Sequence, residues 1–274
     1  MKGLLRTMSS LFSAVKGNFT PRMLRRYVLI EALVFWGLIF IAWMSYPAEN
    51  RYSIMTHTFS FLGSFESKHN PQWWWIFSIA MTFWGTANLP LVLYAYRRFA
   101  TISKWGARAG AGLFLVGCVG IVLIAIFPDA RGTVIGNWEW TEIHEKAAVA
   151  VAAGFILGIL WHGALLLKDL LFSGRNSIFQ HRKFIGPYLF WGTVTGIAAY
   201  YLISWEFIYA DMRAAAAASG VRIGSSWSEA LNTRYSFPLW ENVVIYTFYA
   251  FFAWFILVLP NELPGNQSKR SAPN

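Results

Sequence analysis

Six apolar runs, each long enough to cross a membrane, constrain this chain more than any other feature of its sequence. A helix needs about 20 residues to cross the roughly 30 Å hydrocarbon core of a bilayer. The chain of 274 residues is also 56% hydrophobic and only 13% charged, which leaves too little polar surface to cover a soluble domain of this size. The predicted fold class is therefore all-α, an integral membrane six-helix bundle. The six predicted spans are residues 27–46, 73–95, 110–127, 146–167, 185–206 and 240–259.

The distribution of charge predicts which side of the membrane each loop occupies. With a cytoplasmic N-terminus, the segments on that side carry 16 Lys and Arg against three acidic residues, and the opposite side carries 7 against 10. Basic residues are normally retained on the cytoplasmic side, so both termini are predicted to be cytoplasmic. The net charge of +10 then reflects topology, and no nucleic-acid partner is expected. The predicted location is the bacterial inner (plasma) membrane.

The chain divides into three predicted regions. Residues 1–26 form a cytoplasmic amphipathic segment with a short surface helix, because the apolar residues of its first 16 positions lie on one helical face. Residues 27–260 form the six-span transmembrane domain, and residues 261–274 form a disordered cytoplasmic tail. The single cysteine, Cys118, excludes an intrachain disulfide and a multi-cysteine metal site.

A polar segment after the first span is too polar to cross a membrane. If residues 49–72 were helical, Ser53, His57, Ser60 and Ser64 would share one polar stripe. We therefore expect this segment to rest at the outer interface with its polar stripe turned toward the bundle.

A second outer segment, residues 207–239, separates the last two spans. It contains the sequence DMRAAAAA, which predicts a short helix, and Ser226 to Glu229 match a helix-capping box. Loops of this length are often lids or docking surfaces.

The acidic, tryptophan-bearing loop before the fourth span is the second concentration of polar side chains. Histidine and carboxylate groups can hold a divalent metal or carry out acid–base chemistry on a lipid head group. The predicted catalytic residues are His57, Ser60, Asp129 and His144, and three of these, His57, Asp129 and His144, are the predicted metal ligands. The predicted ligand pocket consists of Trp138, Trp140, Glu142 and Glu145. The spacing matches no established motif such as HExxH, and nothing in the sequence identifies a cofactor.

The fourth span itself carries small residues at every fourth position. Ala150, Gly154 and Gly158 form a stripe that allows a neighbouring helix to approach closely inside a bilayer.

Three short motifs resemble a bacterial six-span membrane family of unknown function and, more remotely, the DRAM-like membrane proteins. They are His57, Ser60, Leu62 and Gly63 after the first span, Phe127 to Asp129 at the end of the third, and His144 at the start of the fourth. The resemblance extends from about Tyr27 to Leu259. It implies a six-helix bundle with an outward-facing polar site, and it brings no settled activity. The long segment between the last two spans departs from the family pattern and points to a specialised partner or lid.

Two classes of function follow from these observations. The first is a membrane protein that binds a lipid-like amphiphile, or serves as an accessory subunit of a membrane assembly, through an outward-facing polar pocket. Abundant tryptophan, the glycine stripes and the long outer segment favour this class, with membrane lipids and other membrane subunits as partners. The alternative is an intramembrane lipid hydrolase or transferase that uses the outer histidines and carboxylates. Transport is a third hypothesis and is less favoured, because the centres of the spans are apolar apart from Asn88 and Pro90.

Overall fold

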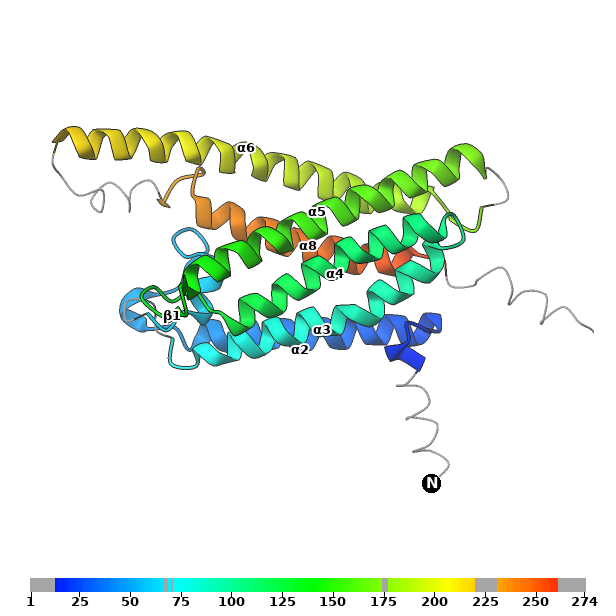
Figure 1. The fold of residues 1–274 in the computed structure, drawn as a ribbon, viewed down its shortest axis with the longest axis horizontal. Helices are drawn as coiled ribbons and strands as arrows, with labels where there is room; N and C mark the ends of the chain where they lie inside the picture. Colours follow the sequence, from blue (N-terminus) through cyan, green and yellow to red (C-terminus); the bar gives the residue numbers. More distant parts are fainter. Residues whose placement is uncertain (1–12, 67–68, 70, 174–176, 220–230, 261–274) are drawn as a thin grey trace, which may run out of the picture.

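The computed structural model describes residues 13–66, 69, 71–173, 177–219 and 231–260, and it confirms a predominantly helical protein. The long helices lie side by side along one axis and alternate in direction (Figure 1). They are α2 (Pro21–Met44), α3 (Trp74–Phe99), α4 (Lys104–Ile126), α5 (Trp140–Phe172), α6 (Arg182–Ser219) and α8 (Phe237–Val258).

Among the described residues, five helices are long and apolar enough to cross a membrane, namely α2, α3, α4, α5 and α8. These five correspond to five of the six predicted spans. The remaining run, residues 185–206, lies within α6, where glycine, threonine, tyrosine and tryptophan dilute the aliphatic residues. Helix α6 is 38 residues long and lies alongside α8 (Figure 1).

Three helices, α2, α4 and α8, begin before their apolar runs, each with a polar side chain that caps its first turn. The Thr20 hydroxyl accepts a hydrogen bond from the Met23 N–H at 3.3 Å, and Pro21 takes the first helical position. Ser103 and Ser236 cap α4 and α8 in the same way. Hydropathy alone therefore placed most helix starts several residues too late.

Glycines bring α4 and α5 into close contact, as the small-residue stripe predicts. A Cβ atom added at Gly154 would lie 2.4 Å from the backbone nitrogen of Gly117, and one at Gly158 would lie 2.6 Å from the Phe114 ring. Side chains larger than hydrogen would force the two helices apart at these positions.

Helix α6 replaces the short helix predicted after the fifth span. Residues 211–218 form its final turns, because Ala and Arg favour continuation and no Gly or Pro interrupts the chain after Trp205. These turns extend past the ends of the neighbouring helices (Figure 1). The predicted capping box at Ser226 to Glu229 lies outside the described residues.

The segment after α2, residues 45–66, is called the outer segment below, and it is not the amphipathic helix considered from the sequence. It contains two 3₁₀ turns, η1 (Ala48–Asn50) and η2 (Phe59–Gly63). Its serine, threonine and histidine side chains bond to nearby groups in the same loop, an arrangement that competes with regular helix. A two-stranded antiparallel hairpin, β1 (Val134–Ile135) with β2 (Trp138–Glu139), lies at the same end of the bundle (Figure 1).

Both ends of the described chain meet at the opposite end of the bundle. The Arg97 guanidinium donates to the Asn18 side-chain oxygen at 2.5 Å, and Arg98 Nε donates to the Pro260 carbonyl at 3.0 Å. The predicted surface helix over residues 1–12 and the tail over residues 261–274 lie outside the described residues.

Candidate functional site

A groove of about 420 Å³ lies between α2 and α8, beneath the outer segment. Phe40, Trp43 and Ile54 in its wall are 56%, 43% and 39% exposed, so the groove opens to the side of the bundle. Five of its eight lining residues are aromatic, and none is charged. The lining consists of Trp36, Ile39, Phe40, Trp43, Tyr52, Ile54, Leu62 and Tyr246.

Asn242, on α8, fixes the polar wall of this groove. It is completely buried, and its side-chain nitrogen donates to the carbonyls of His57 at 3.1 Å and Pro238 at 2.8 Å. Its side-chain oxygen accepts from the Tyr52 hydroxyl at 3.2 Å and from the Tyr246 hydroxyl at 3.3 Å. One amide therefore joins α8 to the outer segment and holds both groove tyrosines.

His57 lies in the outer segment with both ring nitrogens hydrogen-bonded. The Ser53 backbone N–H donates to Nδ1 at 3.3 Å, so Nδ1 is an acceptor and the neutral ring carries its proton on Nε2. Nε2 then donates to the Asn50 side-chain oxygen at 3.1 Å. Burial lowers the pKa of His57 below its ordinary value of 6.5. This arrangement gives His57 a role in holding the loop and leaves neither nitrogen for a metal ion.

Aromatic rings surround His57 and close the outer segment against α2. The Tyr46 hydroxyl lies 3.0 Å from Nδ1 of His69, whose ring stacks on Phe61 with centroids 3.8 Å apart. The ring centroids of Tyr46 and Tyr52 lie 5.3 and 5.5 Å from that of His57. Burial raises the pKa of Tyr46 and of Tyr52, so both phenols retain their protons.

Asp129 and His144 hold the loop between α4 and α5. His144 is buried, and its Nδ1 lies 2.9 Å from the Phe127 carbonyl, to which it donates. Asp129 Oδ1 accepts from the Thr141 hydroxyl at 3.2 Å. The remaining predicted catalytic residue, Ser60, pairs with the Thr58 hydroxyl at 3.0 Å. Ser60, the predicted serine, thus pairs with another hydroxyl, whereas among the described residues the hydroxyls that face His57 and Asp129 are those of Thr56, 2.8 Å from His57 Nδ1, and Thr141.

The predicted pocket residues lie around the hairpin and the first turns of α5, away from the groove. Trp138 is 51% exposed and packs under the Lys146 ammonium, 3.6 Å from the ring centroid. Glu142 and Glu145 are exposed as well, whereas Trp140 packs edge-on against Phe127.

The predicted metal ligands do not form a recognisable metal site. Across the described ranges, no three His, Cys, Asp or Glu side chains are placed to hold one ion.

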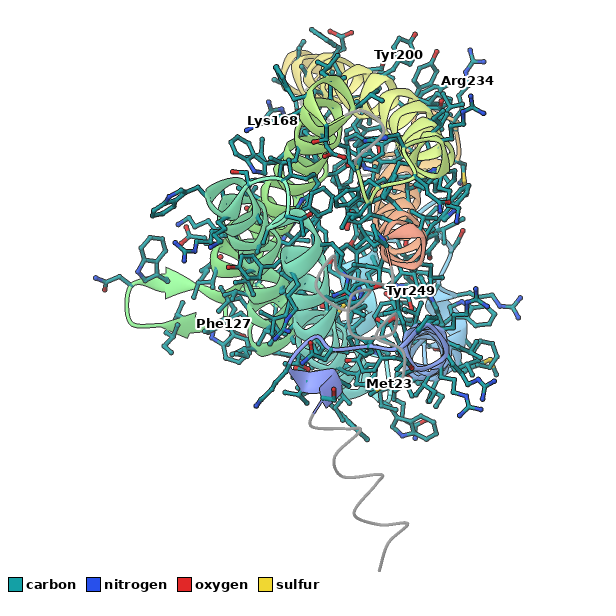
Figure 2. The ribbon with its side chains drawn as sticks, turned by 90° about the vertical axis from the view of Figure 1, so that its right-hand side faces the viewer. Met23, Phe127, Lys168, Tyr200, Arg234 and Tyr249 are labelled. Atoms are coloured by element: carbon teal, nitrogen blue, oxygen red, sulfur yellow. The ribbon has the colours of Figure 1, made fainter. Side chains whose placement is uncertain are left out.

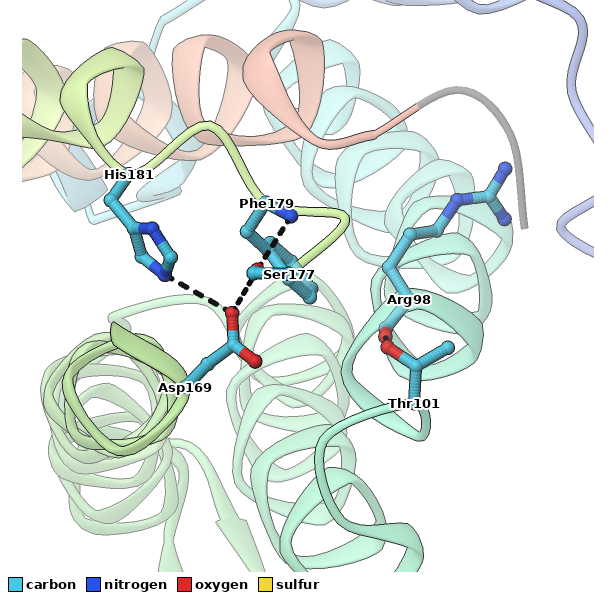
Figure 3. A network of polar contacts seen from close by, with 6 residues as sticks. All are labelled: Arg98, Thr101, Asp169, Ser177, Phe179 and His181. Carbon is cyan, nitrogen blue, oxygen red and sulfur yellow. Dashed lines mark hydrogen bonds and ion pairs between the residues drawn. The ribbon is translucent and has the colours of Figure 1, made fainter. Parts of the chain in front are cut away.

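A second polar network lies at the opposite end of the bundle, after α5 (Figure 3). Asp169 Oδ2 accepts from the Ser177 hydroxyl, and the same oxygen lies 3.1 Å from Nε2 of His181. The carboxylate therefore stands between serine and histidine. A nucleophilic serine requires the histidine in that middle position, so this trio fastens the α5–α6 loop and does not form a catalytic triad.

Glu31 is a buried carboxylate inside the bundle. It is 4% exposed, and its Oε2 accepts from the Tyr249 hydroxyl at 2.7 Å. Figure 2 places Tyr249 inside the bundle, whereas Tyr200 and Arg234 lie at its edge. Glu31 on α2 is therefore paired with a tyrosine of α8.

Sequence reasoning missed the residues that build the groove. Asn242 and Tyr246 are four residues apart within the last apolar run, and this polar face was the available signal. Tyr52 and Trp36 carried no comparable signal, because aromatic residues are common throughout the chain.

Comparison with known proteins identifies no relative. The chain matches no protein-family model, and no curated protein or solved structure is significantly similar to it.

Proposed function

We propose that this protein crosses a bacterial inner membrane six times and binds a lipid-like amphiphile in the groove between α2 and α8. The observation that carries the proposal is the groove itself, with a volume of about 420 Å³ and a wall built mainly from aromatic side chains. Ligand sites of this kind are mostly apolar and carry a few fixed polar groups. Tyr52, Tyr246 and the buried Asn242 supply those groups here.

The position of the groove favours a ligand that enters from the bilayer. Trp36 to Trp43 lie in the last three turns of α2, beside exposed apolar residues such as Leu33 and Met44. In a membrane, acyl chains would cover this surface, and an amphiphile could slide its head group under the outer segment without crossing water.

Six crossings are favoured over five by the direction of the helices. Helix α6 runs the length of the bundle beside α8, and Asn18 and Pro260 lie at the same end. An even number of crossings with both termini cytoplasmic satisfies this arrangement and the positive-inside distribution of charge. Helix α6 at the edge of the bundle would also suit contact with other subunits of a membrane assembly.

Purification in a mild detergent, followed by mass spectrometry of the intact complex and of extracted lipids, tests the proposal. We expect a reproducible amphiphile to stay bound to the wild-type protein. Ile54→Trp would fill part of the groove and should reduce the amount retained. Val34→Trp is the matched control, because Val34 is also 39% exposed but does not line the groove. A protein that retains no amphiphile, or an equal effect of the two substitutions, would contradict the proposal.

A further inference from the structure

The orientation of the Asn242 amide determines which hydrogen bonds the groove can offer a ligand. The side-chain nitrogen faces two backbone carbonyls, at 3.1 and 2.8 Å, and carbonyls can only accept. The amide is therefore fixed, and its oxygen faces Tyr52 and Tyr246.

Both tyrosine protons are consequently directed away from an incoming ligand. The Tyr246 hydroxyl donates to the Asn242 oxygen, and the Tyr52 hydroxyl donates to that oxygen or to the Thr58 carbonyl at 3.4 Å. A phenol has one proton and two acceptor lone pairs. The phenol oxygens thus retain capacity to accept a hydrogen bond from a ligand and have no proton left to donate.

The other lining residues restrict the chemical class of the ligand further. Trp36 and Trp43 are the lining residues whose side chains carry an N–H donor. Charged side chains are absent from the lining, so a phosphate or ammonium head group would lose hydration without gaining a partner of opposite charge. Most of the lining is aromatic, with Trp36 packed edge-on against Tyr246 at 5.3 Å, and such side chains offer ring faces and edges against which a planar ring can pack.

We propose that the ligand of this groove is a lipid whose head is an uncharged aromatic ring bearing hydroxyl groups, the chemistry of a hydroquinone, attached to an apolar chain. A ring hydroxyl can donate to a tyrosine oxygen and accept from an indole N–H, whereas the carbonyl of the oxidised quinone can only accept. The ring would stack against the aromatic wall, and the chain would leave along α2 into the bilayer. This inference rests on the proposed amphiphile-binding function and specifies its ligand.

The test compares the two oxidation states of one molecule. Purified protein would be titrated with decylubiquinol, kept reduced without oxygen, and with decylubiquinone, with binding followed by equilibrium dialysis. One additional hydrogen bond predicts that the hydroquinone binds about three- to tenfold more tightly. Tyr246→Phe retains the ring and removes the acceptor oxygen, so it should weaken hydroquinone binding and reduce this preference. Tyr200→Phe, at an exposed position on α6, should change neither, and thermal unfolding would verify that both variants are folded.

Equal or tighter binding of the quinone would overturn the inference, as would an unchanged preference in folded Tyr246→Phe protein. Failure of both probes to bind, while a phospholipid stays bound in the native preparation, would also overturn it but leave the amphiphile-binding function standing. Loss of every retained amphiphile would contradict both.

Discussion

At the scale of single residues, Asn242 organises the candidate site. A buried amide in an apolar helix is costly unless its donors and acceptor are all bonded. Asn242 meets this condition by crossing from α8 to the outer segment, where it contacts Tyr52 and the His57 carbonyl. The groove therefore exists in its present shape because one side chain joins two segments that are about 190 residues apart.

Replacing Asn242 with Leu should destabilise the protein by about 2–3 kcal/mol, because two carbonyls and two hydroxyls would lose their shared partner. Asn88→Leu is the matched control. Asn88 is also buried, but its side chain donates to the Trp84 carbonyl in its own helix. Loss of this bond should lower the free energy of unfolding by less than about 1.5 kcal/mol. Thermal unfolding in detergent measures both. Equal losses would show that Asn242 does not join the two segments as described.

His57 should make stability depend on pH. Burial lowers the pKa of His57 in the folded protein. As the pH falls, His57 is therefore protonated more readily in the unfolded chain than in the folded one. The resulting stabilisation is complete above about pH 6.5 and is lost as the pH falls through the lowered pKa. We expect His57→Asn to show a smaller drop in melting temperature than wild type between about pH 7.5 and 5.5. His181→Asn serves as the comparison, and a drop as large in His57→Asn as in wild type would refute the assignment.

At the scale of helices, glycine contacts hold α4 and α5 together. Apolar side chains alone provide little driving force for helices to associate in lipid, so close backbone approach and packing determine which helix pairs form. Gly117 and Gly154 face each other across this interface, whereas Gly112 has open space around it.

Gly154→Ala should therefore destabilise the bundle by about 1–3 kcal/mol, because the added methyl would meet backbone that no side-chain rotation can move. Gly112→Ala in α4 is the control and should be neutral or slightly stabilising, since alanine is the better helix former. Melting temperatures of the two variants in the same detergent provide the comparison. A neutral Gly154→Ala would mean that the helices are farther apart than described.

At the scale of the whole molecule, the arrangement predicts which loops face the exterior. The hairpin and the outer segment lie at one end, and the α3–α4 turn lies at the end where Asn18 and Pro260 meet (Figure 1). If the termini are cytoplasmic, the hairpin faces outward.

Cysteine labelling tests this orientation. In a Cys118→Ala background, which contains no other cysteine, Asn137→Cys in the hairpin should react with a membrane-impermeant maleimide in intact cells. Lys104→Cys, at the start of α4, should react only after the cells are permeabilised. Both positions are exposed in the structure, so the reverse pattern would mean that the bundle is inserted the other way.

The outer histidines show why the site was harder to predict than the fold. His57, Asp129 and His144 suggested a shared metal or catalytic site, because clustered titratable groups often mark one. His57 instead bonds to Asn50 within the outer segment, whereas Asp129 and His144 hold the α4–α5 loop through Thr141 and the Phe127 carbonyl. A sequence lists the polar groups of a loop, but it does not reveal which backbone groups they must satisfy.

The helical membrane architecture follows from the sequence alone. In lipid, a run of about 20 apolar residues satisfies its backbone hydrogen-bonding groups by forming a helix. The close contact at Gly154 also follows, since small residues at every fourth position of an apolar helix indicate close packing against a neighbouring helix. The groove was decided by the tertiary structure: Trp36, Tyr52 and Tyr246 come from three separate segments. Only folding brings them around Asn242, because hydrogen bonds between distant segments depend on distances that local sequence patterns do not encode.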